Sequence, residues 1–538
     1  MKTPKLFIAE YAKAKNVASN LEELKKIGRK IKKYIMKTKM YFTVFNVNLF
    51  LIQFLYGLVI LFLVNYVIKF VIKVCKLPSG PWGLPFVGYL PFIRQDAYNH
   101  MTELAEKYGP VFSLKCGQFD VVVINQWKFI KEALANEHLL GRPKEISLPG
   151  IIEQSSFAEM SGERWKEQRR IALTTLRDVG LGKSAMEDSI RDEIKSFTEV
   201  IKSFEGESIS ISDKLSLSVS NHISTLLFGR KYAHDEPLSQ VMAKLLAQSD
   251  MMKYFNVVTF MPAIARFVIK LNLIDMAETF SIFKKLESHI GDEVNEHRKK
   301  NADCNEMKDY IDGFLGEMSK RQNEKNSTFN LKTLQRNAIL FYGAGSDTIS
   351  STFKWIMLYL VKHPEYQKRI RDEIKQTIGL NRQPENVDRK EMPFTMAFIY
   401  EALRHSSLVP LNSPRRATED TKLGGYSIPK DSLVIFNFWS VHRDPNLWDN
   451  PELFNPERFL NEDKSKAIKP PYLVAFSGGK RVCPGESFAY LQLFLYLVSF
   501  VQQFEISAEL VEDISLEKVH KHALRKKDVP NLMFKSVD

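Results

Sequence analysis

The longest run of apolar residues lies near the N-terminus, where the 24 residues from Tyr41 to Val64 carry no formal charge. A helix of this length spans the hydrocarbon core of a bilayer, so the pattern predicts a transmembrane anchor over residues 41–68. A helix buried inside a soluble domain is the alternative. A cleaved signal peptide is not expected, because the run is too long and no small-residue cleavage site follows it.

Residues 1–40, which precede the predicted anchor, combine apolar positions at helical spacing with a strong positive charge. They contain twelve Lys or Arg and three Glu, so they carry most of the chain's formal net charge of +13. From Asn20 to Lys39 the pattern fits a helix that lies on a membrane surface, with a solvated charged extension as the alternative. The apolar positions are Leu21, Leu24, Ile27, Ile31 and Ile35.

The charges on the two sides of the predicted anchor indicate conflicting topologies. Lys and Arg are enriched on the cytosolic side of membrane helices, and residues 1–40 outweigh Lys69, Lys73 and Lys76. That balance would place the rest of the chain in the lumen. We instead expect a cytosolic domain, either because the native protein starts at Met36 or Met40 or because the extension does not govern topology. N-terminal sequencing of the native protein tests the first option, which a mature terminus at residue 1 would exclude.

The chain beyond the anchor is predicted to form a hinge and one large, mostly helical domain. Residues 69–85 are basic and then rich in Pro and Gly, which predicts a semi-rigid hinge. Residues 86–538 contain no low-complexity linker or repeat and are predicted to be one domain. Leu331–Lys362 predicts a helix of roughly 45 Å, Pro364 begins the next, which runs to Gly379, and residues 298–328 predict a surface loop with a short helix. Short strands are predicted at Val111–Lys115, Val121–Ile124 and Leu433–Phe436.

Charge and cysteine usage exclude several classes of function. Outside residues 1–40 the chain is close to neutral, so a basic nucleic-acid-binding arm is disfavoured. Binding that survives deletion of the extension would revive that alternative. The four cysteines show neither CxxC pairs nor zinc-type spacing, so no disulfide framework or zinc site is expected. Three of them are expected to be small buried apolar residues: Cys75, Cys116 and Cys304.

The fourth cysteine, Cys483, lies in the segment Phe476–Gly485, which reads FSGGKRVCPG. Gly478 and Gly479 allow the backbone to bend closely around a flat cofactor. Cys483 precedes the apolar run Phe488–Phe504, which predicts a buried helix, and the N-terminus of a helix favours a thiolate. A thiolate on haem iron helps to break the O–O bond of dioxygen. Cys483 is therefore a candidate haem ligand, and a structural cysteine in a glycine loop is the alternative.

This segment resembles the haem-binding signature of the cytochrome P-450 family, F-x-x-G-x-R-x-C-x-G, and the resemblance extends from about residue 77 to the C-terminus. It implies a mainly α-helical fold with small β-sheets, in which haem b lies between the long helix and the cysteine loop. The predicted transmembrane helix would precede this fold. The signature is matched at Phe476, Gly479, Arg481, Cys483 and Gly485.

The predicted long helix contains Gly343 and Gly345, each of which costs about 1 kcal/mol relative to alanine. Close approach of a ligand would explain them, and tight helix packing is the alternative. The stretch from Ala344 to Thr348 resembles the family's oxygen-binding helix, A/G-G-x-D/E-T. The resemblance implies that Thr348 hydrogen-bonds dioxygen at the haem and that Asp347 relays protons from water. The family usually has a hydroxyl residue where this chain has Ile349, so its water supply is expected to differ.

Two further sets of residues match family motifs. Glu401 and Arg404 resemble the E-x-x-R helix, and Pro456–Phe459 resembles the meander motif, which implies a buried structural network of Glu401, Arg404 and Arg458. An exposed helical pair is the alternative for the first two residues alone. Haem propionates need cationic partners. The resemblance implies that these come from the W-x-x-x-R helix, matched at Trp165 and Arg169, and from Arg415, which stands where many relatives have a histidine. For each arginine taken singly, a surface role is the alternative. The residues expected to bind the propionates are Trp165, Arg169, Arg415 and Arg481.

The resemblance implies a monooxygenase that inserts one atom of dioxygen into a lipophilic substrate, such as a steroid, a fatty acid or a foreign compound. NADPH would supply the electrons through NADPH-cytochrome P-450 reductase, with cytochrome b5 as a second candidate partner. The expected location is the endoplasmic reticulum membrane, with the catalytic domain in the cytosol. A mitochondrial location is the alternative, disfavoured because the extension contains acids and few arginines.

Two rival functions use the same cofactor. One is a haem-thiolate isomerase or dehydratase that acts on peroxides without dioxygen. Such enzymes often depart from the acid–threonine pair, which this chain keeps at Asp347 and Thr348. The other is a non-catalytic haem or lipophile binder, which predicts haem spectra without a product. Stoichiometric consumption of NADPH and dioxygen with substrate distinguishes the monooxygenase from both.

Overall fold

The computed structural model describes residues 4–74, 76–144, 155–181, 184–233, 236–237, 239–241, 260–271, 273, 277–300, 307–325, 327–509 and 530–537. The chain divides into two compact units, Met1–Lys76 and Leu77–Asp538. The described part of the first unit is essentially one helix, α1 (Pro4–Val74), which includes the helix predicted for residues 20–39. Within the described residues, no helix has a stretch long and apolar enough to cross a bilayer. Several side chains of the anchor predicted at residues 41–68 lie outside the described part.

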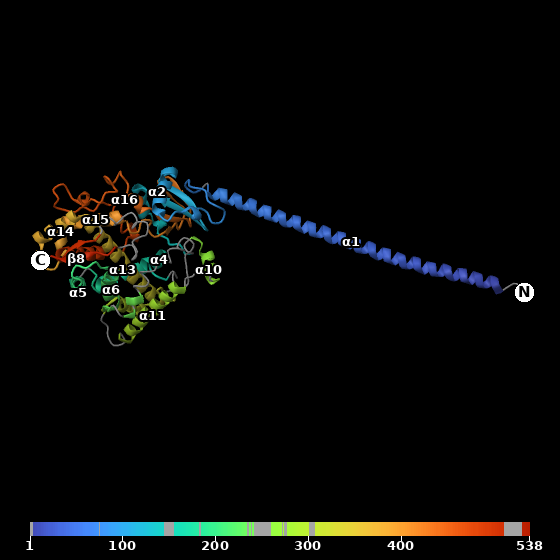
Figure 1. Cartoon of the computed structure of the whole chain (residues 1–538), viewed down its shortest axis with the longest axis horizontal. Helices are drawn as coiled ribbons and strands as arrows, with labels where there is room; N and C mark the ends of the chain where they lie inside the picture. The colour runs from blue at the N-terminus through green and yellow to red at the C-terminus, as the bar shows by residue number, and fades with distance from the viewer. Residues whose placement is uncertain are drawn as a thin grey trace. The chain divides into compact units, whose positions relative to one another are not determined.

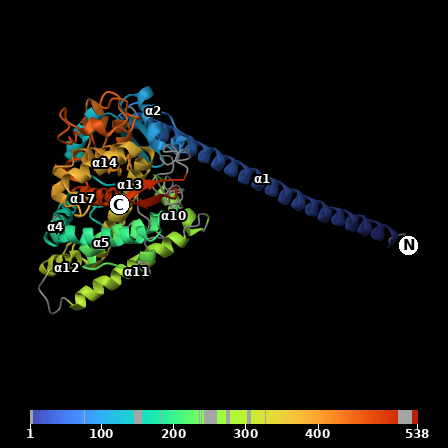
Figure 2. The same ribbon diagram turned by 60° about the vertical axis from the view of Figure 1, so that its left-hand side comes forward.

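The second unit is mainly helical. Helix α13 passes through its middle, with α2 and the adjacent strands on one side and α5 and α11 on the other (Figures 1 and 2). The helices are α2 (Ala97–Tyr108), α3 (Trp127–Ala135), α4 (Gly162–Asp178), α5 (Ser184–Lys202), α6 (Ser212–Phe228), α10 (Pro262–Lys270), α11 (Ala277–Lys300), α12 (Tyr310–Lys320), α13 (Leu331–Lys362), α14 (Pro364–Thr377), α15 (Pro393–Ser406), α16 (Phe438–His442) and α17 (Glu486–Gln503). Short 3₁₀ turns lie at Leu90–Phe92, Glu137–Leu139, Asn386–Lys390, Pro456–Phe459 and Gly479–Arg481.

The strands form small sheets, as expected for this class. One described sheet has the order β1-β2-β6-β3, in which β2 and β6 are parallel and the other pairs are antiparallel. The pairs β4–β5 and β7–β8 each form a two-stranded antiparallel sheet. The strands are β1 (Val111–Cys116), β2 (Phe119–Ile124), β3 (Arg415–Arg416), β4 (Thr421–Leu423), β5 (Tyr426–Ile428), β6 (Leu433–Phe436), β7 (Phe504–Ser507) and β8 (Met533–Ser536).

The long helix α13 has the predicted bounds because both of its ends carry local signals. The Asn330 side chain accepts a hydrogen bond from the Thr333 backbone N–H at 3.0 Å, which caps the N-terminus. Pro364 lies at the first position of α14, where its missing N–H costs nothing. From Ile349 to Val361 every residue of α13 is buried, so this half of the helix runs through the main hydrophobic core.

The segment predicted as a surface loop with a short helix, residues 298–328, contains the end of α11 and a helix of 11 residues, α12, so the predicted helix is confirmed. Residues 301–306 lie outside the described part. Helix α12 is anchored because it buries Tyr310, Ile311 and Phe314. Residues 69–74 of the predicted hinge continue helix α1. The Pro/Gly-rich part that follows packs on the sheet, since the Ser113 hydroxyl donates to the Pro78 carbonyl at 2.6 Å. A Cβ on Gly80 would lie 1.6 Å from the Ser113 carbonyl oxygen, so that position requires glycine.

Candidate functional site

The residues predicted to contact a cofactor converge on a cavity inside the second unit. Its volume is about 270 Å³, which lies near the lower end of the range for ligand clefts, ~300–1000 Å³. Its walls come from α4, α6, α13 and the segment around Cys483. A second cavity, bordered by α15, shares five wall residues with the first: Thr348, Ile349, Phe476, Arg481 and Cys483. The two spaces therefore meet at the thiol.

The backbone around Cys483 is held in a tight turn against α3. Gly479 has a φ of +65°, and a Cβ there would lie 2.1 Å from the Leu134 carbonyl oxygen, so only glycine fits. The Cys483 backbone N–H donates to the Phe476 carbonyl at 2.9 Å, which closes the turn. Gly485, another glycine of the motif, donates its backbone N–H to the Cys483 thiol. The accessible surface of Cys483 faces the two cavities.

The ionisation of Cys483 differs from the sequence expectation. Helix α17 begins at Glu486, so the thiol lies just before the helix rather than within its first turn. Burial raises the pKa of the thiol, and the Gly485 N–H and Arg169 only partly oppose that effect. The chain alone therefore favours the thiol. A coordinated metal ion would reverse this preference, because metal binding deprotonates a coordinating thiol.

Arg142, Arg169 and Arg481 border one side of the cavity, and the buried Arg415 interacts with Arg142 and Arg481 without being among the described wall residues. Burial, together with the neighbouring arginines, lowers the pKa of Arg481 to about 8. Burial and Arg142 lower the pKa of Arg415 to about 9, and burial lowers that of Arg142 to about 10. The charged groups that act on these four are one another and the Cys483 thiol, not carboxylates. Such a concentration of positive charge would be stabilised by an anionic ligand.

Two buried side chains, Arg415 and Trp165, have donors without hydrogen-bond partners, and these donors test whether haem fits. Arg415 is 1% exposed, and none of its three guanidinium nitrogens has a hydrogen-bond partner. The buried Trp165 indole N–H also has none. Two carboxylates, the complement of the haem propionates, would satisfy both side chains. The residues present therefore fit haem, with a thiol and a cationic cluster bordering one cavity.

The other arginines of the cluster join separate segments of the wall. Arg481 donates to the Leu140 and Met160 carbonyls at 2.9 and 2.6 Å, and its guanidinium lies 3.8 Å from the Trp165 ring centre. Arg169, one helical turn after Trp165 in α4, donates to the Val482 carbonyl at 2.6 Å. It therefore ties α4 to the cysteine loop.

Arg142 is the member that sequence reasoning missed. It donates to the Ser413 and Pro414 carbonyls at 2.9 and 2.8 Å, just before Arg415. It lies in an irregular segment after Leu140, and no motif or periodicity distinguishes it from a surface arginine. Only the contacts with a segment more than 270 residues away bring it to the site.

On α13, Thr348 and Asp347 have different surroundings. Thr348 borders both cavities, and its hydroxyl donates to the Ala344 carbonyl at 2.8 Å. Asp347 is exposed and is not among the described wall residues of either cavity. Gly345 borders the first cavity, and a Cβ there would lie 2.5 Å from Ile223 Cδ1 on α6. Because that atom is the end of a flexible side chain, packing of α13 on α6 favours a small residue here but does not require glycine. Ile349 is buried beside Thr348.

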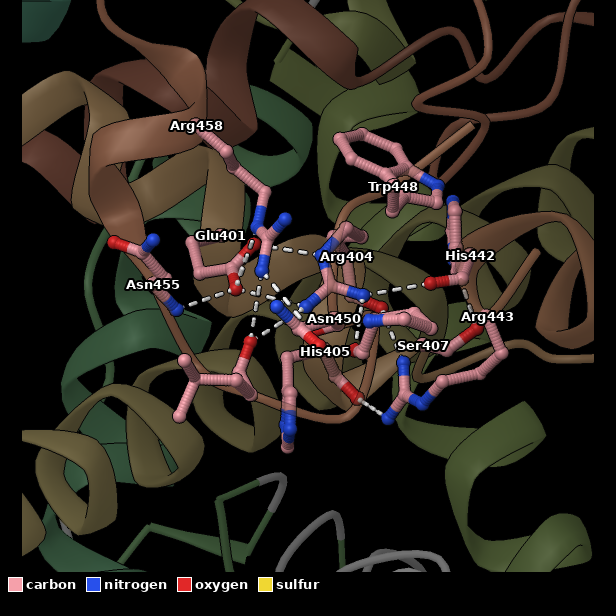
Figure 3. Close-up of polar contacts among 12 residues, drawn as sticks. Glu401, Arg404, His405, Ser407, His442, Arg443, Trp448, Asn450, Asn455 and Arg458 are labelled. Atoms are coloured by element: carbon pink, nitrogen blue, oxygen red, sulfur yellow. Dashed lines mark hydrogen bonds and ion pairs between the residues drawn. The ribbon is translucent and has the colours of Figure 1, made fainter. Parts of the chain in front are cut away.

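Glu401 and Arg404 of α15 form a fully buried ion pair with two contacts, at 2.7 and 2.8 Å. Arg458 donates to the same Glu401 carboxylate at 3.3 Å. Arg404 also donates to the His442 and Pro451 carbonyls at 2.6 and 2.8 Å. Figure 3 shows these side chains pointing toward one another from separate segments. The structure thus brings the three predicted residues together.

The rest of the first cavity is apolar and partly aromatic. Phe157 and Phe341 have ring centres 5.2 Å apart on its wall. Leu226 and Leu340 add aliphatic surface. Such walls provide contacts to hydrocarbon and few hydrogen bonds, so they suit a lipophilic molecule.

Comparisons with known proteins agree with this geometry. A family model described as Cytochrome P450 matches residues 78–529. Cytochrome P450 2J2 of Homo sapiens is 35% identical over 452 residues, covering 82% of this chain and 88% of that protein. Cytochrome P450 2A9 of Mesocricetus auratus is 34% identical over 455 residues, covering 82% and 89%. Cytochrome P450 2A6 of Homo sapiens is 33% identical over 459 residues, covering 83% and 90%.

Proposed function

The chain belongs to the cytochrome P450 family, and from that premise we propose that the cavity beside Cys483 holds both haem and a lipophilic substrate. Membership establishes the reaction class. The protein is a haem-thiolate monooxygenase of the endoplasmic reticulum membrane, and it uses dioxygen and electrons from NADPH-cytochrome P450 reductase. The isomerase and the non-catalytic binder are therefore set aside.

In this proposal Cys483 Sγ would hold the iron of a bound haem. Bound haem supplies an iron centre that binds and activates dioxygen when electrons arrive. Phe476, Gly479 and Gly485 shape the turn that presents the sulfur, and the Gly485 N–H stabilises the thiolate. The observation that carries the proposal is the meeting of this thiol with a buried arginine cluster that lacks carboxylates.

The propionates would pair with Arg142, Arg169, Arg415 and Arg481, and with the Trp165 indole N–H. Each carboxylate that enters replaces repulsion between guanidinium groups with charge-assisted hydrogen bonds, which are the strong ones. Arg415 gains most, because its nitrogens have no other partner.

Proton delivery is assigned to Thr348 and Asp347 in this proposal. The Thr348 hydroxyl borders the cavity and donates to a backbone carbonyl, so it can rotate to donate instead toward the cavity. Asp347 is exposed and can exchange protons with bulk water. Because Ile349 adds no hydroxyl, water must reach Thr348 without a second side-chain donor at that position.

The spectrum of the ferrous carbon-monoxide complex tests the ligand assignment. We expect the red-shifted band of a thiolate-ligated haem, and we expect Cys483→Ala to lose it. The matched control is Cys116→Ala, which removes a buried thiol on β1. A Cys483→Ala protein that keeps the band would overturn the assignment.

Coupling of NADPH oxidation to product tests the role of Thr348. Positioned proton donors contribute typically ~10²–10⁴-fold, so Thr348→Ala is expected to lower product formed per NADPH by at least about tenfold while NADPH oxidation continues. Thr348→Ser retains a hydroxyl and should restore most of the coupling. Equal coupling in all three proteins would exclude this role.

We also propose that residues 41–68 anchor the protein. In this arrangement a basic extension at residues 1–40 precedes the anchor, a hinge follows at residues 69–85, and residues 86–538 form the cytosolic monooxygenase domain. The uncharged run from Tyr41 to Val64 supports the anchor. Alkaline carbonate should leave the full chain in the membrane and should extract a chain that lacks residues 41–64. Equal extraction of both would count against the anchor.

A further inference from the structure

Residues 20–39 of α1 expose large apolar side chains on a helix. Leu21, Leu24, Ile27, Ile31 and Ile35 are each between 48% and 65% exposed. Side chains of this size are normally buried against another element when they recur at helical spacing. The monooxygenase reaction does not use this surface, which lies in the first unit of the chain.

The apolar residues share one side of the helix. At 3.6 residues per turn, the five positions and Tyr34 fall within an arc of roughly 140°. The opposite side carries Lys25, Lys26, Arg29, Lys30, Lys33 and Lys37. Lys32 and Lys39 lie at the border between the two sides, where their aliphatic stems can cover apolar surface while their charges stay in water.

The basic side is strongly positive, although Glu22 also lies on it. Residues 20–39 contain eight Lys or Arg and two Glu. Among the described residues, the ion pairs of this protein do not include the cations from Lys25 to Lys33. A face with this charge is complementary to an anionic surface.

We propose that residues 20–39 form an interfacial helix that binds the surface of an anionic lipid bilayer. The apolar side enters the boundary between headgroups and acyl chains, and the lysines contact the lipid phosphates and carboxylates. A nucleic acid would use the basic side but leave the apolar side in water. A second copy would cover the apolar side but bring two basic faces together. Only an anionic bilayer satisfies both sides of the helix.

The inference goes beyond the proposed function, because it does not depend on haem or substrate. It has one structural consequence where the helix meets the proposed anchor. Helix α1 runs unbroken through Lys39 and Tyr41, so residues 20–39 can lie flat on the bilayer that holds residues 41–64 only if α1 bends at this junction on binding.

Tryptic cleavage between Lys25 and Lys33 tests this binding in the full chain. The protein is reconstituted into vesicles of phosphatidylcholine alone or of phosphatidylcholine with phosphatidylserine. Each Lys or Arg near an anionic surface contributes about 1 kcal/mol, so we expect cleavage to be slower by on the order of tenfold or more in the anionic vesicles. High salt should remove most of the difference, because it screens the lysines.

Two variants separate the apolar face from charge and general exposure. Ile27→Gln with Ile31→Gln removes apolar surface without changing charge, and it should abolish the protection. The matched control, Met36→Gln, changes an exposed apolar residue on the basic side and should leave protection unchanged. Both variants keep every tryptic site.

Several results would overturn the proposal. They are equal cleavage in both vesicle types, protection without vesicles that rises with protein concentration, and protection by RNA equal to that by anionic vesicles. Failure of the proposed anchor is seen separately, as loss of flotation with neutral vesicles. Failure of the haem assignment is seen in the carbon-monoxide spectrum.

Discussion

At the scale of single residues, Arg415 shows how the site departs from a stable protein interior. A buried cation without a hydrogen-bond partner costs several kcal/mol of desolvation, and both burial and Arg142 lower its pKa to about 9. At neutral pH it nevertheless stays charged. The chain thus keeps an unfavourable group that becomes favourable when a carboxylate enters.

Arg415→Met is therefore expected to have opposite effects on the haem-free and haem-bound protein. The haem-free protein should gain roughly 1–3 kcal/mol of unfolding free energy, because an unsatisfied buried group is removed. The haem-bound protein should lose haem about tenfold faster or more, because charge-assisted hydrogen bonds contribute ~1.5–3 kcal/mol. Urea unfolding and haem transfer to apomyoglobin measure the two effects.

The neighbouring Arg416→Met is the control. Arg416 pairs at 2.7 Å with Asp431, whose side chain is 57% exposed, and an exposed pair contributes little, about 0–1 kcal/mol. Haem loss should not change in this variant. A haem-bound Arg415→Met protein that retains haem as well as the unaltered chain would contradict the propionate assignment.

Glu401 presents the converse case, a buried charge that is fully paired. Its carboxylate accepts from Arg404, Arg458 and the Asn455 backbone N–H, the last at 2.7 Å. Glu401→Gln should lower the unfolding free energy by about 3–5 kcal/mol, because it leaves buried guanidinium groups without compensation. Lys368→Gln, which breaks the exposed Lys368–Asp372 pair, should cost under about 1 kcal/mol. Similar losses in the two variants, measured by urea unfolding, would argue against a structural network.

At the scale of elements, the junction of α11 and α12 depends on one ionised histidine. His297 donates from Nε2 to the Asp309 carboxylate at 2.7 Å and from Nδ1 to the Glu293 carbonyl at 2.7 Å. Asp309 also caps α12 by accepting from the Asp312 N–H at 3.0 Å. Burial alone would lower the pKa of His297, but Asp309 outweighs it and raises the pKa to about 9.

Stability should therefore fall as pH rises through this pKa. The contribution of His297 is fully present below about pH 6.5, the ordinary value, and is lost toward pH 9, where the folded imidazolium loses its proton. Its full size is on the order of 3 kcal/mol. Urea unfolding at several pH values should show this loss in the unaltered chain and not in His297→Gln. His289→Gln, on the same helix, is the control and should keep the pH dependence. A His297→Gln protein whose stability depends on pH as in the unaltered chain would exclude this role of the His297–Asp309 pair.

Element boundaries were predicted best where local signals and burial agree. The bounds of α13 and β6 match the sequence expectation. The short helix predicted within residues 298–328 is α12, which is held in place because three apolar residues dock on α4, α6 and α13. Tertiary burial thus stabilises a helix that the local pattern only indicates.

At the scale of the whole molecule, the second unit has its own hydrophobic core. The described members of its buried clusters begin at Leu77, and the largest cluster joins α13, α15 and α17 with α5 and α6. A unit that buries its apolar residues internally is expected to fold by itself.

A chain that begins at Leu77 should therefore fold and bind haem. We expect the same carbon-monoxide band and the same urea midpoint for haem-domain unfolding as in the full chain. A matched chain that begins at Val111, which lacks α2 and the segment that packs on β1, should lose stability because Met101 and Leu104 leave the core. Loss of the band on removing residues 1–76 alone would show that the first unit supports the haem domain.

The sequence by itself determined the mainly helical class, the long helix α13, the cysteine motif and most residues of the proposed cofactor site. These follow from periodicity and short motifs, which are properties of neighbouring residues. Only the tertiary structure decided that Arg142 joins Arg415, that Gly345 packs against Ile223, and that burial raises the pKa of the Cys483 thiol. Convergence, close packing and desolvation depend on residues far apart in the chain, so no local pattern records them.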